Sequence, residues 1–284
     1  MTLRLPDDVA RAMADAADRL GAFAGRVTFT PVVSSTNNLA LRLAADGADD
    51  GTTVLAAAQT AGRGRQGHVW FSPPDAGLYF SLVIRGLPSA LVTLMAGVAV
   101  VEGVRAATGL QVELKWPNDV VLPTPETQGG RPQLVKLGGI LTETSWLGGV
   151  ADAIIVGIGI NVARSEYPEA LAATASSLEA ERGAPVDRAA VLVESLAALT
   201  YWRDVLTAGD TNRLLARWRA LAPSSEGAVV TWNHEGRRRQ GTTAGIDTDG
   251  ALRVRCEGAL QRVVAGELTW VSVPASGVTD AAGD

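Results

Sequence analysis

The length, composition and charge of the chain exclude several classes of protein. Its 284 residues are enough for one large domain or two modest ones, and 47% hydrophobic with 19% charged residues is typical of a globular protein, not a disordered or fibrous one. The net charge of −5 has the wrong sign for a protein whose main function is binding nucleic acid. The single cysteine, Cys256, excludes an internal disulfide and a multi-cysteine metal site.

The sequence also carries no sign of export or membrane insertion. Charged residues occupy positions 4, 7 and 8, where a secretory signal would be apolar. The longest nearly uncharged run, 91–101, is too short to cross a bilayer. We therefore expect a soluble cytoplasmic protein that does not associate with membranes.

Apolar periodicity predicts alternating helices and strands over the first 222 residues. Side chains spaced three and four apart predict helices at 8–23, 36–45, 89–108, 185–202 and 212–221. A serine or threonine at 34–36 is expected to cap the second helix, and Gly109 to end the third. Runs rich in Val, Ile and Leu predict strands at 26–33, 53–58, 78–84, 112–115, 118–122, 137–143 and 153–160. Together they indicate an α+β fold in which helices pack on a mixed β-sheet.

The pattern changes after residue 222. Short alternating segments separated by turn signals at 233–236, 247–250 and 257–258 predict a small all-β domain over residues 223–274. Residues 275–284 are small and polar, as in a flexible tail. Residues 123–133 read as a mobile loop inserted between two strands.

The segment GRGRQG at 62–67 formally matches the dinucleotide-binding pattern G-x-G-x-x-G. That pattern must open directly into a helix, whereas HVWFSPP follows here at 68–74 and cannot start one promptly. What remains is a glycine-rich loop with two arginines, suited to bind a carboxylate or phosphate. A solvated basic loop, or a fragment of RGG-type RNA binding, explains the same six residues.

Three further motifs combine polar groups with tight turns. KWPND at 115–119 exposes an asparagine and an aspartate at a proline-fixed bend, KLGGIL at 136–141 places a lysine before two glycines, and GIGINV at 157–162 ends an apolar strand with an asparagine. Taken singly, each has an ordinary structural explanation as an Asx turn, a solvated lysine or a strand-end turn.

Their order and spacing are far more specific. Together with SSTN at 34–37 and AQTAGRGRQG at 58–67, the motifs resemble the successive signatures of the biotin protein ligases. The resemblance extends from Ser34 to Asn161, and the small β-domain resembles their C-terminal barrel of the Src-homology-3 kind. It implies a catalytic domain like that of the class II synthetase-like biotin and lipoate ligases over residues 1–222.

The resemblance implies an ATP-dependent biotin--[biotin carboxyl-carrier protein] ligase. Such enzymes condense biotin with ATP to biotinyl-5′-AMP and transfer the biotinyl group to one lysine of a carboxylase carrier domain. Biotin, ATP, Mg²⁺ and the carrier domain are the ligands and partners that this predicts. Relatives include monomers and dimers, so a homodimer is compatible with the prediction.

The resemblance also assigns roles to individual residues. Lys136 would bridge the biotin carboxylate and the α-phosphate, and Arg65 would retain the adenylate. The positions assigned to biotin are Ser35, Thr36, Asn37, Gln59, Arg63, Gly64, Arg65, Lys136 and Gly139. Those assigned to ATP or the adenylate are Arg65, His68, Trp70, Asn118, Asp119, Lys136 and Asn161, with Asp119 on the magnesium side.

Two departures from the family pattern bear on function. His68 stands where the family loop commonly has arginine, which predicts a weaker or pH-dependent phosphate contact. Only about 30 residues precede Ser34, too few for the winged helix-turn-helix of relatives that also act as repressors, so we expect a monofunctional ligase that does not bind DNA.

Two alternatives remain. One is a lipoate or octanoate ligase of the same architecture, although its substrate has no ureido ring for the Ser-Thr-Asn segment to recognise. The other is a non-catalytic protein that binds biotinyl-AMP.

Overall fold

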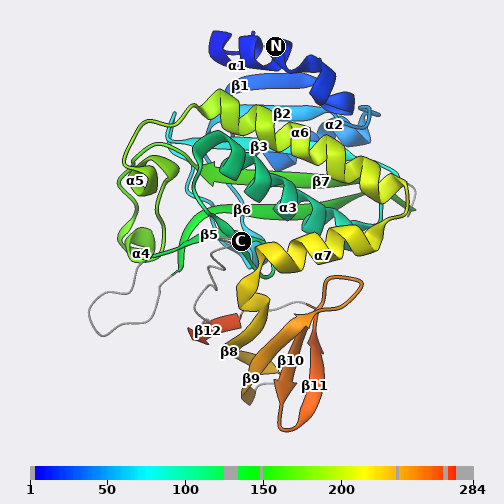
Figure 1. Cartoon of the computed structure of the whole chain (residues 1–284). Coiled ribbons are helices and arrows are strands. Elements are labelled where there is room, and N and C mark those ends of the chain that lie inside the picture. The colour runs from blue at the N-terminus through cyan, green and yellow to red at the C-terminus, as the bar shows by residue number, and fades with distance from the viewer. Residues whose placement is uncertain (1–3, 125–133, 148–149, 235–236, 265–267, 273–284) are drawn as a thin grey trace, which may run out of the picture.

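The chain folds into two β-sheets, and helices cover the larger one (Figure 1). The computed structural model describes residues 4–124, 134–147, 150–234, 237–264 and 268–272. Its helices are α1 (Asp7–Asp15), α2 (Thr36–Ala45), α3 (Ser89–Thr108), α4 (Glu169–Ala172), α5 (Leu178–Arg182), α6 (Arg188–Thr207) and α7 (Thr211–Leu221). Its strands are β1 (Val27–Val33), β2 (Thr53–Gln59), β3 (Gly77–Ile84), β4 (Glu113–Lys115), β5 (Asp119–Pro123), β6 (Leu134–Leu147), β7 (Val150–Asn161), β8 (Glu226–His234), β9 (Arg237–Ile246), β10 (Leu252–Cys256), β11 (Ala259–Val263) and β12 (Leu268–Ser272).

The larger sheet has seven strands in the order β1-β2-β3-β7-β6-β5-β4. Strands β1 and β2 are parallel, and the other neighbouring pairs are antiparallel. The sheet is therefore mixed and carries helices, which confirms the predicted fold class.

Helices α3, α6 and α7 cover one face of this sheet and enclose the main core (Figure 1). Helix α3 is the one helix in the described part of the chain that is long and apolar enough to cross a membrane. Most of its residues are buried in the core, a property that central helices of globular proteins share. Gly109, with φ 77°, ends α3 as predicted, because glycine adopts this left-handed conformation without strain.

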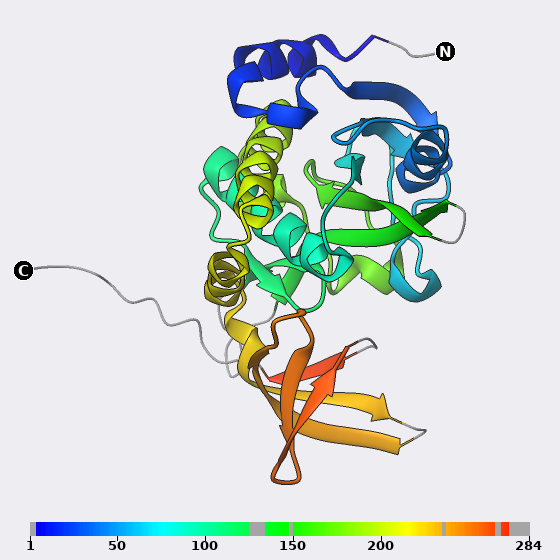
Figure 2. The ribbon, with the colours of Figure 1, turned by 90° about the vertical axis from the view of Figure 1, so that its right-hand side faces the viewer.

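Helix α2 lies on the opposite face of the sheet (Figure 2). Side chains alternate along a strand, so Phe80 and Leu82 of β3 enter the main core while Val83 packs against Ala40 and Ala44 of α2. This second face carries the functional site described below.

The smaller sheet has five antiparallel strands in the order β11-β10-β9-β8-β12, in agreement with the expected small barrel. Two hydrogen bonds tie it to the larger unit: the Trp116 indole donates to the Gly250 carbonyl at 3.0 Å, and Arg219 donates to the Ile246 carbonyl at 3.0 Å. The division of the chain at residue 222 stays a prediction.

Some predicted elements are wrong in detail. The single helix at 8–23 is instead α1 followed by two 3₁₀ turns, because the backbone leaves the helical region at Ala16, with φ −106° and ψ 9°. The apolar spacing was nevertheless correct, since Val9, Met13 and Phe23 are all buried.

Two other differences concern helix starts. Ser35 is the N-cap residue of α2, but its side chain makes no capping hydrogen bond. Helix α6 begins at Arg188, not 185, because Asp187 caps it by accepting from the Ala189 and Ala190 amides.

The sequence did not predict the short helices α4 and α5. Most of the predicted loop at 123–133 and the whole tail at 275–284 lie outside the described residues.

Candidate active site

A cavity of about 470 Å³ opens on the α2 face of the larger sheet. The start of α2 and the loops after β2 and β4 contribute to its wall, as do strands β5, β6, β7 and β12. All the residues that the sequence assigned to biotin, ATP or magnesium line it: Ser35, Thr36, Asn37, Gln59, Arg63, Gly64, Arg65, His68, Trp70, Asn118, Asp119, Lys136, Gly139 and Asn161. The fold thus brings every predicted site residue together.

Glycines on two paired strands make room for this cavity. Gly139 of β6 lies opposite Gly159 of β7, and both strands have these positions on the α2 face. A Cβ at Gly159 would lie 2.4 Å from the Trp70 indole nitrogen, and one at Gly139 would lie 3.2 Å from the same ring. The Trp70 ring therefore packs against two strand positions where only glycine leaves room for it.

The glycine-rich loop folds back on itself as a small hairpin. The Gly64 amide donates to the His68 carbonyl at 2.7 Å, and the Trp70 amide donates to the Gly62 carbonyl at 2.9 Å. Gln66 adopts φ 54° at the tip. This geometry directs the two arginines of the loop to different partners across the cavity.

Arg63 forms an ion pair with Glu143 of β6, whereas Arg65 donates to the Asn118 side-chain oxygen at 3.4 Å. Burial lowers the pKa of Arg65, and the nearby Asp119 carboxylate opposes that shift. An arginine keeps its charge even so, and a partly desolvated guanidinium binds an anion more strongly than a hydrated one.

At the cationic end of the cavity, Lys115 and Lys136 lie near one carboxylate, that of Asp119. The Lys136 ammonium lies 2.5 Å from Asp119 Oδ1 and 5.4 Å from the centre of the Trp70 ring. Lys115 lies 5.8 Å from the centre of the Trp270 ring on β12. Burial is the main cause that lowers the pKa of Lys115; Lys136 lowers it further, and Asp119 opposes both.

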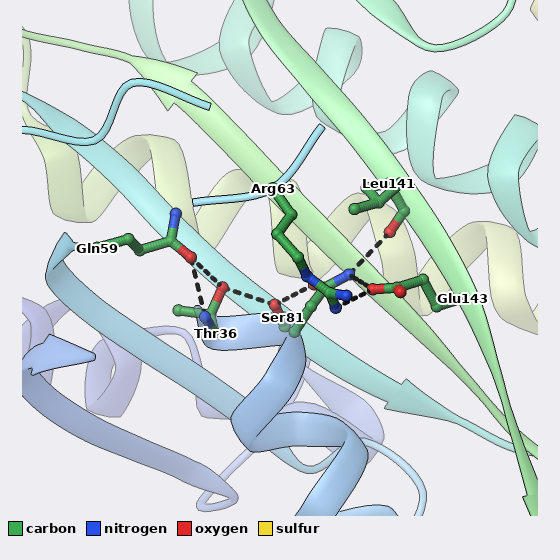
Figure 3. Close-up of polar contacts among 7 residues, drawn as sticks. Thr36, Gln59, Arg63, Ser81, Leu141 and Glu143 are labelled. Atoms are coloured by element: carbon green, nitrogen blue, oxygen red, sulfur yellow. Dashed lines mark hydrogen bonds and ion pairs between the residues drawn. The ribbon is translucent and has the colours of Figure 1, made fainter. Parts of the chain in front are cut away.

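At the other end of the cavity, hydroxyl and amide side chains lie beside the guanidinium of Arg63 (Figure 3). The Thr36 amide and hydroxyl donate to Gln59 Oε1 at 2.9 and 3.1 Å. The Ser81 hydroxyl donates to Asn37 Oδ1 at 2.6 Å and lies 2.8 Å from the Thr36 hydroxyl. Asn37 in turn donates to Glu143 at 2.8 Å.

Backbone carbonyls fix the two remaining amides. Asn118 donates to the Ile140 carbonyl at 2.7 Å, and Asn161 donates to the Ser176 carbonyl at 2.9 Å. These bonds use only the nitrogen of each side-chain amide and hold both residues in place, Asn118 before β5 and Asn161 at the end of β7.

No cluster of three or more His, Cys, Asp or Glu side chains occurs within the described ranges. Asp119 is the single acidic residue among the described residues that line the cavity. Magnesium commonly binds through one or two carboxylates while phosphates and water complete its shell. The donor set therefore fits a metal that arrives with a nucleotide, not a resident ion held by protein alone.

Several residues of the site were missed from the sequence. Lys115 belongs to the KWPND motif and could have been chosen for its lysine alone. Ser81 and Glu143 sit in apolar strands, and Trp270 lies more than a hundred residues from the motifs. No spacing along the chain connects these three residues to the cavity.

Comparisons with known proteins agree with this geometry. A model of the biotin/lipoate A/B protein ligase family matches residues 29–161. The biotin--[acetyl-CoA-carboxylase] ligase of Paracoccus denitrificans is 33% identical over 244 residues, which cover 82% of this chain and 96% of that protein. The bifunctional ligase/repressor BirA of Bacillus spizizenii is 34% identical over 248 residues, covering 84% of this chain and 72% of that protein. The solved structure of the biotin protein ligase from Aquifex aeolicus in complex with biotin and ATP aligns with a TM-score of 0.72 and 28% identity, covering 87% of this chain and 98% of that one.

The chain therefore belongs to the biotin/lipoate A/B protein ligase family. Within that family its relatives are biotin protein ligases, which confirms the resemblance seen in the motifs and the predicted class of enzyme.

Proposed function

We propose that the protein activates biotin with ATP and transfers it to one lysine of a biotin carboxyl carrier domain. In the first step a biotin carboxylate oxygen attacks the α-phosphorus, the bond to the β-phosphate breaks, and pyrophosphate leaves. In the second step the carrier lysine nitrogen attacks the acyl carbon, AMP leaves, and the nitrogen loses a proton.

The observation that carries this proposal is the convergence of four cationic side chains on one cavity. Arg63, Arg65, Lys115 and Lys136 come from three separate segments of the chain. A carboxylate and a phosphate about 4 Å apart repel by about 4 kcal/mol at an effective dielectric constant near 20. Preorganised cations offset this repulsion and stabilise the charge that develops in the transition state.

Lys136 is the cation best suited to lie between the two anions. Its ammonium is anchored by Asp119 and faces the Trp70 ring, where an adenine could stack. Arg65, facing Asn118 on the far side of the cavity, would hold the phosphate of the adenylate. Mg²⁺ would accompany ATP with Asp119 as its protein ligand and would supply charge neutralisation for the phosphates.

The polar end suits the ring of biotin. Thr36, Gln59 and Ser35 offer hydroxyl and amide groups there, as a ureido ring requires. Lipoate and octanoate have no such ring, so these groups favour biotin over the acids of the related ligases.

Pyrophosphate release separates the alternatives directly. The purified protein is mixed with ATP, Mg²⁺ and biotin, or with lipoate or octanoate in its place. Release with biotin alone supports the proposal, release with another acid favours the lipoate-type ligase, and no release with any acid favours a non-catalytic binder.

Transfer is tested with a purified carrier domain and its lysine-to-arginine variant. Mass spectrometry should find one biotinyl group on the former and none on the latter. The sequence has only two lysines, Lys115 and Lys136, so the same spectra show at two positions whether the ligase labels itself.

A further inference from the structure

Two residues behind the polar end of the cavity control hydrogen bonds without lining it. They are Ser81 of β3 and Glu143 of β6, and both face the same side of the sheet as α2. Neither has a place in the motifs of the sequence. Their hydrogen bonds hold the start of α2, where Thr36 (Figure 3) is followed by Asn37.

The direction of the hydrogen bonds at Thr36 follows from what each partner can do. An amide oxygen only accepts, so the single Ser81 hydroxyl proton lies on Asn37 Oδ1 at 2.6 Å. The Ser81 oxygen therefore accepts from the Thr36 hydroxyl, 2.8 Å away, and Gln59 Oε1 is a second acceptor for that proton at 3.1 Å. Protein acceptors hold the Thr36 proton, and Thr36 therefore meets a ligand as an acceptor.

Gln59 has the complementary role. Its oxygen already accepts twice from Thr36, and its Nε2 donates to Ser72 at 2.9 Å. A carboxamide nitrogen carries two protons, so one N–H donor is left. The polar end thus presents an acceptor beside a donor, the complement of the N–H and C=O groups of a cyclic urea.

Glu143 anchors this arrangement. Its carboxylate accepts from the Asn37 amide at 2.8 Å and pairs with Arg63 of the glycine-rich loop. Asn37 must then turn its oxygen to Ser81, where Gly157 leaves the space: a Cβ there would lie 2.1 Å from that oxygen.

We propose that Ser81 and Glu143 are positioning residues that preset the donor and acceptor order with which the cavity recognises the ureido ring. This inference rests on the proposed function. Without Ser81, the Thr36 hydroxyl proton loses the nearer of its two acceptors, and the Asn37 oxygen loses its donor.

The test is biotin-dependent pyrophosphate exchange by Ser81→Ala. We expect the KM for biotin to rise about tenfold, with kcat and the KM for ATP within about twofold of the wild type. Ser81→Cys keeps a weak donor of similar size and should restore part of the affinity. Ser195→Ala is the control, because Ser195 is equally buried, lies on α6 and makes no hydrogen bond through its hydroxyl.

A second pair of variants tests Glu143. Glu143→Gln replaces one acceptor oxygen by a donor and should raise the KM for biotin to a similar extent. Glu194→Gln is matched to it, since Glu194 also pairs with an arginine, Arg19, and its side chain is 27% exposed against 28% for Glu143. The control should keep the wild-type KM for biotin.

The outcomes separate this inference from the proposed function. A wild type that shows no exchange with biotin contradicts the function itself. An active wild type with an unchanged KM for biotin in Ser81→Ala and Glu143→Gln overturns the positioning role, as does a loss that falls equally on biotin and ATP. If Ser81→Ala does not fold, the KM for biotin of Ser81→Cys decides in the same way.

Discussion

Lys136 owes its position to both of its backbone groups and to its ammonium. Its amide donates to the Thr174 carbonyl at 2.7 Å, its carbonyl accepts from the Ser176 amide at 3.0 Å, and Asp119 holds its side chain. A lysine fixed at three points needs little reorganisation when a charge forms beside it.

We predict that Lys136→Ala lowers the rate of adenylate formation at least about a hundredfold, because a preorganised transition-state donor is lost. Pyrophosphate release at saturating biotin and ATP measures it. Arg19→Ala serves as the control, since Arg19 pairs with Glu194 away from the cavity and should leave the rate unchanged. Near-normal release by Lys136→Ala would contradict the assignment.

Arg65 has a different role because it holds the product of the first step. Arg65→Gly should retain part of the pyrophosphate release. The biotinyl-adenylate should escape from the cavity, because the phosphate of the adenylate loses a charge-assisted contact. We expect biotin on the lysines of an added bystander protein such as albumin. Labelling confined to the carrier would show that another group retains the adenylate.

At the scale of elements, strand β7 serves both the core and the cavity. Side chains alternate along it, so Ile158 and Ile160 lie in the main core while Gly157, Gly159 and Asn161 face the cavity. One strand thus builds the core and the site together.

The floor under Trp70 gives a prediction at this scale. Gly159→Ala should displace the indole and raise the KM for ATP about tenfold, because the new Cβ would overlap the ring. The KM for biotin should change less. Gly47→Ala is the comparison: its methyl group meets no atom within 4 Å, and the φ of 86° places its cost on stability and not on the KM for ATP. Equal KM values for ATP in both variants would show that Trp70 does not contact the nucleotide.

A buried tyrosine, Tyr79, and a half-buried one, Tyr167, make the stability of the fold sensitive to alkali. Burial raises the pKa of Tyr167 to about 12 and that of Tyr79 further. Unfolded tyrosine ionises near pH 10, so above about pH 10 the unfolded state releases protons that the folded state retains. Stabilisation from these groups is present below that pH and is lost as the pH rises through the folded values.

We therefore predict that the free energy of unfolding falls between about pH 10 and pH 12, measured by urea denaturation. Tyr79→Phe should reduce that slope, while any difference from the wild type below about pH 9 should not depend on pH. A slope unaffected by Tyr79→Phe would mean that other groups cause the loss.

The sequence predicted those helices and strands that local patterns define, and it missed the features that depend on contacts between distant segments. Helix α3 has its predicted bounds, and the seven strands of the larger sheet lie within a few residues of their predicted positions, because periodicity and glycine stops are local. The helix at 8–23 was predicted too long, because no glycine or proline marks its end at Ala16 in the sequence. Ser81 and Glu143 were missed because their partners, on α2 and in the glycine-rich loop, lie far from them along the chain.

At the scale of the whole molecule, the smaller sheet completes the cavity of the larger one. Leu268, Thr269 and Trp270 of β12 line the cavity wall, and Trp270 covers the ammonium of Lys115. A cation against an aromatic face is held electrostatically and shielded from water. The C-terminal barrel is therefore part of the site and not only an appendage of the fold.

Removing that cover should affect the first chemical step. In Trp270→Ala the Lys115 ammonium gains water, so its pKa should rise towards the ordinary lysine value and its pull on phosphate should weaken. We predict that kcat/KM for ATP falls about tenfold, and that Trp270→Phe, which keeps an aromatic face, retains most of the activity. Leu260→Ala on the far strand of the same sheet is the control, because Leu260 is exposed and does not line the cavity. If both alanine variants lose activity equally, the barrel acts through its stability; if neither does, Lys115 works without Trp270.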